Sequence, residues 1–157
     1  MLNAIRYGAL FALAIFLWAL VETIVGLHGR YIRYHEYLSY FFAVPSVGIM
    51  YWGIRSGKKT KPGGVSFRSA FANGLGITTV VTLLCPVVWY VFCVAINPAF
   101  LDNMAHHVTD TKGMAASLAF QWYSLPTFLF MSAFSTAVIG TIISLVIAII
   151  MARRQYK

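Results

Sequence analysis

Four long runs of apolar residues divide this 157-residue chain and leave only short polar segments between them. Each run approaches or exceeds the roughly 20 residues that an α-helix needs to cross a hydrocarbon core about 30 Å thick. The predicted fold class is therefore all-α, an integral membrane bundle of four transmembrane helices in a single transmembrane domain, residues 1–157. The predicted helices cover about residues 7–27, 37–54, 67–96 and 125–151.

The composition excludes an ordinary soluble domain. Hydrophobic residues make up 60% of the chain and charged residues only 10%, whereas a soluble domain carries roughly a quarter charged residues. The net charge of +8 comes from basic residues placed between the apolar runs. No DNA- or RNA-binding motif accompanies them, so we expect no nucleic-acid partner.

The basic residues also predict the topology. With four spans, the N-terminus, the second loop and the C-terminus share one side of the membrane. That side would hold nine Lys and Arg residues and the other side three. Because cytoplasmic loops are enriched in basic residues, we expect both termini in the cytoplasm and the protein in the inner membrane. The basic loop, residues 55–68, should attract anionic lipid headgroups, at about 1 kcal/mol per basic residue.

Glu22 is a carboxylate inside the first apolar run, where a charge at the bilayer centre costs about 2.5–3.5 kcal/mol on insertion scales. Such groups face protein or water, so Glu22 marks the inward face of its helix. We hypothesise a contact from Glu22 to His35 or to Arg30; these two residues and His28 lie just above Glu22. The alternative is a protonated Glu22 that donates to a backbone carbonyl. Glu22 and His35 are thus the candidate functional residues.

Small residues mark the faces on which the helices should pack closely. In the first helix they share a face with Glu22, and in the last helix they recur at every fourth position. We interpret them as helix-packing positions, and the alternative is a polar path through the bundle. The predicted packing residues are Gly8, Ala12, Ala19, Gly26, Ser132, Thr136, Gly140 and Ser144.

The loop between the third and fourth spans predicts a short surface helix after Asn97 and Pro98. Its apolar stripe would lie on the membrane or cover the end of the bundle. Asp102, His106 and Asp110 recur at every fourth position on another face and are the candidate metal ligands. They span too far for one site on a straight helix, so we expect a solvated face, no metal and no cofactor.

The chain resembles the domain-of-unknown-function 4199 family of small bacterial membrane proteins. This resemblance covers nearly the whole chain and rests on the order and spacing of short motifs. It implies a four-helix inner-membrane protein and supplies no activity; the outer loop is shorter and less charged than is usual for the family. The motifs are Arg6-Tyr7-Gly8, residues 18–22, Gly26-Leu27, His35-Glu36, Pro45 with Gly48-Ile49, Gly53-Ile54-Arg55, residues 63–67, Ala70-Phe71, Gly74 and Asn97-Pro98.

No nucleophile, phosphate-loop or zinc-protease motif is found. We therefore predict a non-enzymatic membrane protein, an accessory or envelope component that has a protein partner or forms a homo-oligomer. The alternative is a small ion or solute carrier or channel subunit that uses Glu22. A third hypothesis is an enzyme acting on lipid headgroups, with Glu22 and His35 as its acid–base pair.

Overall fold

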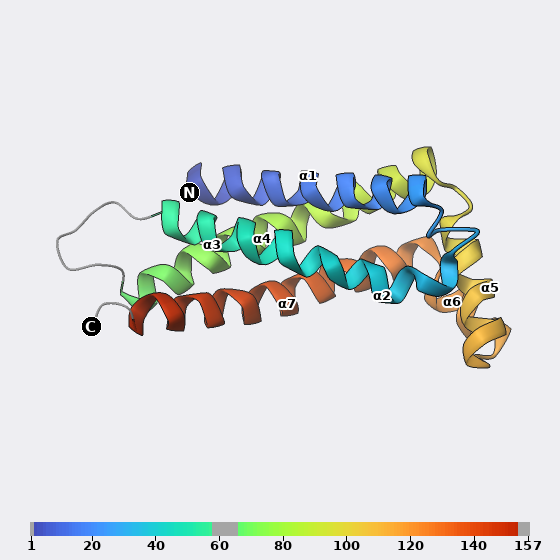
Figure 1. Ribbon diagram of the computed structural model, residues 1–157. Helices are drawn as coiled ribbons and strands as arrows, with labels where there is room; N and C mark the ends of the chain where they lie inside the picture. The colour runs from blue at the N-terminus through green and yellow to red at the C-terminus, as the bar shows by residue number, and fades with distance from the viewer. Residues whose placement is uncertain (1, 58–65, 154–157) are drawn as a thin grey trace.

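The computed structural model describes residues 2–57 and 66–153, and every regular element within these ranges is helical. Four helical stretches lie side by side along one axis (Figure 1). Each is long and apolar enough to cross a membrane, and the predicted all-α bundle is confirmed. The four stretches are Leu2–Val25, Ile32–Ser56, Phe67–Ile96 and Leu125–Ala152.

The second stretch is assembled from short pieces and begins earlier than the predicted residue 37. The η1 turn and the α2 helix precede a second 3₁₀ turn, η2, and only then does the regular α3 helix begin. Pro45 lies in the first turn of α3, not near the middle of a long helix. Proline has no N–H to donate, and the first turn of a helix tolerates this loss. The pieces are η1 (Ile32–Tyr34), α2 (His35–Ser39), η2 (Tyr40–Phe42) and α3 (Ala43–Ser56).

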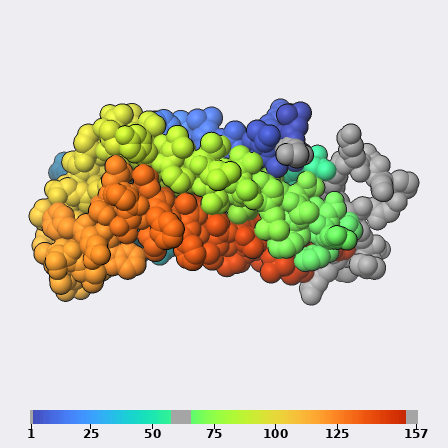
Figure 2. Space-filling view, turned by 180° about the vertical axis from the view of Figure 1, so that it is seen from behind, coloured from blue at the N-terminus to red at the C-terminus, as the bar shows by residue number. Residues whose placement is uncertain are grey.

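The third and fourth stretches form the closest pair in the bundle. α4 (Phe67–Val91) continues into a π-helical turn, η3 (Phe92–Ile96), and α7 (Leu125–Arg153) runs back beside it. Figure 2 shows the two lying together along the molecule. The side chain of Ser66 accepts a hydrogen bond from the backbone N–H of Ser69 at 3.3 Å, so Ser66 caps α4 as its residue type predicts.

Reciprocal contacts between small residues explain how closely α4 and α7 pack. A Cβ atom built on Gly74 of α4 would lie 2.6 Å from the Ser144 side chain of α7. A Cβ atom on Gly140 of α7 would lie 2.7 Å from the Thr78 side chain of α4. The two hydroxyls are 3.3 Å apart and hydrogen-bonded. Each helix thus uses a glycine to make room for a hydroxyl of the other, as small residues do between membrane helices.

The remaining predicted packing positions of α7 also face its neighbours or its own backbone. Thr136 donates to the Cys85 sulfur of α4 at 3.4 Å. Ser132 is half-buried and donates to the Leu129 carbonyl at 2.9 Å. The hydroxyls on this face are therefore engaged within the protein.

α1 (Leu2–Val25) packs against α4 and α3 through its small residues. A Cβ atom on Gly8 would lie 2.5 Å from Val80, and both Ala12 and Ala19 are buried. Gly26 was predicted as a packing residue within the first helix, but α1 ends one residue before it. Its φ of 85° is a left-handed conformation that favours glycine, so Gly26 ends the helix and turns the chain.

Two further helices, α5 (Phe100–Lys112) and α6 (Ala116–Trp122), form a cap across one end of the bundle (Figure 1). The sequence predicted one helix here. Phe100, Met104 and Val108 of α5 are buried, so its apolar stripe covers the end of the bundle. We call this end the cap end. The first residue of α1 and the last residue of α7 lie at the opposite end.

An apolar core fills the half of the bundle away from the cap. Its buried residues come from α3, α4 and α7, and aromatic residues of α1 and α4 pack around them. The predicted basic loop and C-terminus lie largely outside the described residues, because residues 58–65 and 154–157 are not described. The buried members of this core are Met50, Ile54, Ala70, Ile77, Val81, Ile147, Ala148 and Met151.

Candidate functional site

Glu22 lies in the last two turns of α1, near the cap end, and only 4% of it is exposed. Its carboxylate oxygen Oε1 accepts two hydrogen bonds, one from the indole Nε1 of Trp18 at 2.7 Å and one from the Ser39 hydroxyl at 2.5 Å. Indole N–H is a donor only, so Oε1 must act as an acceptor. Trp18 is one turn before Glu22 on the same helix, and Ser39 belongs to α2. The other oxygen, Oε2, is left to face two histidines.

His28 is the first of these histidines and is 3% exposed. The turn at Gly26 folds the chain back, since the Gly26 carbonyl accepts from the N–H groups of both Gly29 and Tyr31. This reversal brings the Nε2 atom of His28 to 3.2 Å from Oε2 of Glu22. The sequence placed His28 just above Glu22 and assigned it no role.

The second nitrogen of His28 determines how its ring is protonated. Nδ1 lies 2.9 Å from the Thr23 hydroxyl, and that hydroxyl already donates its single proton to the Ala19 carbonyl at 2.8 Å. Thr23 can therefore only accept from His28, so Nδ1 carries the hydrogen. In the neutral ring, Nε2 then presents a lone pair to Glu22.

His35, at the start of α2, completes the group. Its Nε2 atom lies 3.7 Å from Oε2 of Glu22, and its ring centroid is 5.2 Å from that of His28. The other ring nitrogen, Nδ1, is buried and has no hydrogen-bond partner among the residues that the structure describes. We call Glu22, His28 and His35 the Glu–His–His centre. One ligand atom from each lies within 4.8 Å of the others.

The cap closes the Glu–His–His centre on one side. The Phe100 ring of α5 lies 4.6 Å from the His28 ring and 6.2 Å from the His35 ring, centroid to centroid. Phe92 of η3 packs edge-on against His28 at 5.4 Å. The amide of Asn103, also on α5, donates to the His28 carbonyl at 2.9 Å. The centre therefore joins α1, α2, η3 and the cap.

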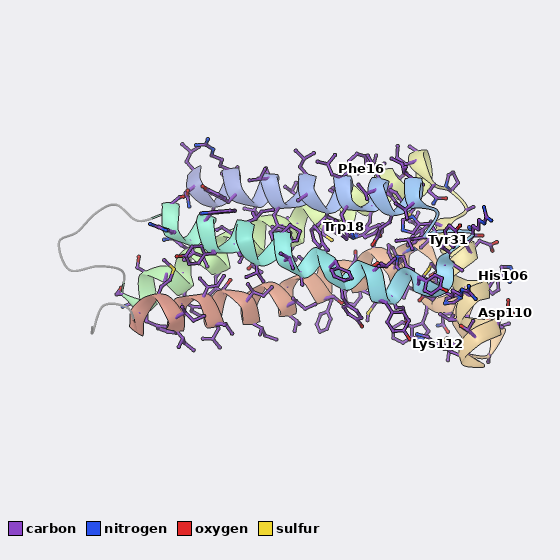
Figure 3. All side chains as sticks on the ribbon, viewed as in Figure 1. Phe16, Trp18, Tyr31, His106, Asp110 and Lys112 are labelled. Atoms are coloured by element: carbon purple, nitrogen blue, oxygen red, sulfur yellow. The ribbon has the colours of Figure 1, made fainter. Side chains whose placement is uncertain are left out.

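A pocket of about 170 Å³ lies on the other side of the centre. Glu22 and His35 line it together with apolar and aromatic side chains of α1, η2 and α4. Figure 3 shows Trp18, which also lines this pocket, on the side of α1 that faces the second span, with Phe16 on the opposite side. The polar groups of Glu22 and His35 thus border a small space inside the bundle.

The three candidate metal ligands of α5 are exposed, and Figure 3 shows two of them, His106 and Asp110, on the cap. His106 is 3.7 Å from Asp102, and both side chains are more than half exposed. Asp110 lines a groove of about 340 Å³ with His106, but the ligand atoms of these three described residues do not all lie within 4.8 Å of one another. Lys112 forms an ion pair with Glu36 of α2, and this hydrogen bond raises the pKa of the Lys112 ammonium.

Of the two hypothesised partners of Glu22, one is found in contact with it and the other is not. His35 contacts its carboxylate, whereas the Arg30 guanidinium lies over the Tyr31 ring at 5.4 Å from the ring centroid. Among the described residues, the hydrogen-bond partners of the Glu22 carboxylate are all side chains, and none is a backbone carbonyl.

The profile of one protein family, described as "Protein of unknown function (DUF4199)", matches residues 6–153, nearly the whole chain. The chain belongs to this family. This DUF4199 protein is a membrane protein by its four long apolar helices, and the resemblance inferred from its motifs is confirmed. No similar protein was found among curated proteins, and no similar structure among solved structures.

Proposed function

We propose that this DUF4199 protein is a non-enzymatic accessory component of the bacterial cell envelope that holds a folded cap at the membrane surface for a protein partner. The supporting observation is that the cap is fixed to the bundle by specific buried contacts. Phe100 packs on the two histidines, and Asn103 bonds the His28 carbonyl. A rigid surface loses less entropy when it binds a partner than a mobile loop does.

The proposed orientation follows from the basic residues. The described ends of α1, α3 and α7 lie at the end of the bundle opposite the cap, where nine Lys and Arg residues of the sequence would gather. The tendency of cytoplasmic loops to be basic then favours termini in the cytoplasm and a cap on the outer face of the inner membrane. Anionic lipid at residues 55–68 would add to this orientation.

Capture of a partner tests this proposal. We expect the protein, cross-linked in native membranes and purified in mild detergent, to carry one partner protein or a second copy in a fixed ratio. Replacing Asp102 and Asp110 by lysine reverses two exposed charges of the cap without touching a buried contact, so the captured species should be lost. Arg6→Gln, an exposed change at the other end of the bundle, is the control.

Two outcomes would contradict the proposal. One is recovery of only monomer and bulk lipid from the wild-type protein. The other is capture that is equally strong in the doubly charge-reversed variant and in the Arg6→Gln control, which would mean that the cap is not the binding surface.

The carrier alternative stays a prediction and finds less support. A carrier that uses Glu22 needs a polar route from the Glu–His–His centre to the far end of the bundle. The far half instead holds the apolar core around Ile54, Ile77 and Ile147. A pocket of about 200 Å³ beside this core has a mainly apolar lining. The hydroxyls of Thr78 and Ser144, which the carrier hypothesis would place along the route, bond each other.

A further inference from the structure

The Glu–His–His centre has the donor set of a transition-metal site. Two imidazole nitrogens with one carboxylate oxygen form a set that holds zinc in proteins, usually with a water as fourth ligand. Imidazole donors favour zinc, iron, copper and nickel over magnesium and calcium, which prefer oxygen. The chain supplies this set from three separate segments: α1, the turn after it, and α2.

The spacing of the donor atoms fits a small tetrahedral ion. Zinc binds nitrogen and carboxylate oxygen at about 2.0–2.2 Å, so two ligands of a tetrahedral ion lie about 3.4 Å apart. The Nε2 atoms of His28 and His35 are 3.2 and 3.7 Å from Oε2 of Glu22. All three ligand atoms lie within 4.8 Å of one another. Shifts of a few tenths of an ångström to about one ångström would close the set around an ion.

Hydrogen bonding leaves two acceptors facing each other. Thr23 fixes the hydrogen of His28 on Nδ1, so the Nε2 lone pair points at Oε2 of Glu22, which is itself an acceptor. Only a proton or a cation between them makes this 3.2 Å contact favourable. A metal-binding histidine characteristically donates its other N–H to a fixed partner, which orients the ring. Thr23 is such a partner.

The remaining oxygen of Glu22 is held in the same way. Trp18 and Ser39 both donate to Oε1, which orients the carboxylate and leaves Oε2 to bind alone. The adjoining pocket of about 170 Å³ leaves room for a water as a further ligand. An ion could reach the centre from the groove on the cap surface, because two residues that line this groove are next to His28. Gly29 follows His28 in the chain, and the Asn103 amide donates to the His28 carbonyl.

We propose that Glu22, His28 and His35 bind one divalent transition-metal ion of the zinc class, through Oε2 of the carboxylate and one nitrogen of each imidazole. This site is independent of the partner proposed for the cap. It is also distinct from the exposed Asp102, His106 and Asp110, which the sequence offered as metal ligands.

Cobalt binding to the full-length protein in detergent, first stripped with EDTA, tests this site. We expect one Co²⁺ per chain, with the intense visible absorption of a tetrahedral ion. Zn²⁺ should displace it and Mg²⁺ should not. Glu22→Gln should abolish the signal, because a neutral amide is a poor ligand. Thr23→Val should weaken binding by about 10–100-fold, as loss of a group that orients a ligand does. His106→Gln, an exposed histidine outside the centre, is the matched control.

Glu22→Gln can still accept from Trp18 and Ser39 and donate to His28, so it should elute and melt as a folded protein. His35→Gln provides a second variant in case it does not. The site is refuted if the wild type binds no Co²⁺. It is also refuted if binding survives unchanged in both the Glu22→Gln and His35→Gln variants, or is lost in His106→Gln.

Discussion

Replacing Glu22 by alanine is expected to lower the free energy of unfolding of the metal-free protein by about 3–5 kcal/mol, the range for removing one partner of a buried ion pair. The change leaves three groups without their partner: the half-buried Trp18 indole and Ser39 hydroxyl, and Nε2 of the buried His28 ring. Each unsatisfied group bears its full desolvation cost. Denaturant titration in one detergent measures the effect.

Glu22→Gln is the matched comparison. Its carbonyl oxygen can accept from Trp18 and Ser39, and its amide can donate to Nε2 of His28, so we expect a loss of only about 1 kcal/mol. Asp102→Asn, a change at an exposed carboxylate, should be close to neutral. A small effect of Glu22→Ala, equal to that of Glu22→Gln, would mean that the buried hydrogen bonds do not hold the bundle together.

Gly74→Ala is expected to destabilise the bundle by about 1–3 kcal/mol, the range for an overpacked core. The added Cβ atom would lie 2.6 Å from the Cβ and Oγ atoms of Ser144 and 3.0 Å from Ile54. α4 and α7 would have to move apart, which would also stretch the Thr78–Ser144 hydrogen bond. Thermal unfolding and denaturant titration measure the loss.

Two further variants make this prediction specific. Gly48→Ala adds a Cβ atom 3.6 Å from the Trp52 ring, which is ordinary contact, and alanine favours helix by up to about 1 kcal/mol over glycine. It should therefore be neutral or stabilising. Adding Ser144→Gly to Gly74→Ala removes the clashing atoms and should restore much of the stability. If Gly74→Ala and Gly48→Ala behave alike, the close approach at Gly74 is not required.

The sequence was sufficient to predict the four-helix architecture, because the length of each apolar run shows directly that it can cross a membrane. The four spans, the surface helix and the close face of Gly140 and Ser144 could all be predicted from residue spacing. The composite second span could not, since its breaks at residues 32–42 depend on packing against the cap and α1. Pro45 predicted an irregularity in this span, but not that the irregular part lies before the proline and that a regular α3 begins at Ala43.

Two of the three residues of the Glu–His–His centre, Glu22 and His35, could be predicted from the sequence, and the role of His28 could not. Glu22 stood out because a carboxylate in an apolar run is costly, and His35 because it lies just above Glu22. The role of His28 depends on where α1 ends: a helix that continues to residue 27 carries His28 above Glu22, whereas a turn at Gly26 folds it back. Glycine near a helix end often marks where the helix stops, so Gly26 was the sequence feature from which this turn could have been predicted.

The coupling between Glu22 and His28 is the most direct test of the Glu–His–His centre, because this centre exists only if these two buried side chains act together. A double-mutant cycle compares Glu22→Ala, His28→Ala and the double variant in the metal-free protein by denaturant titration. We expect a coupling free energy of about 1.5–3 kcal/mol, the upper part of the range for residues in contact. Effects that add to within about 0.5 kcal/mol, as they do for independent sites, would contradict it.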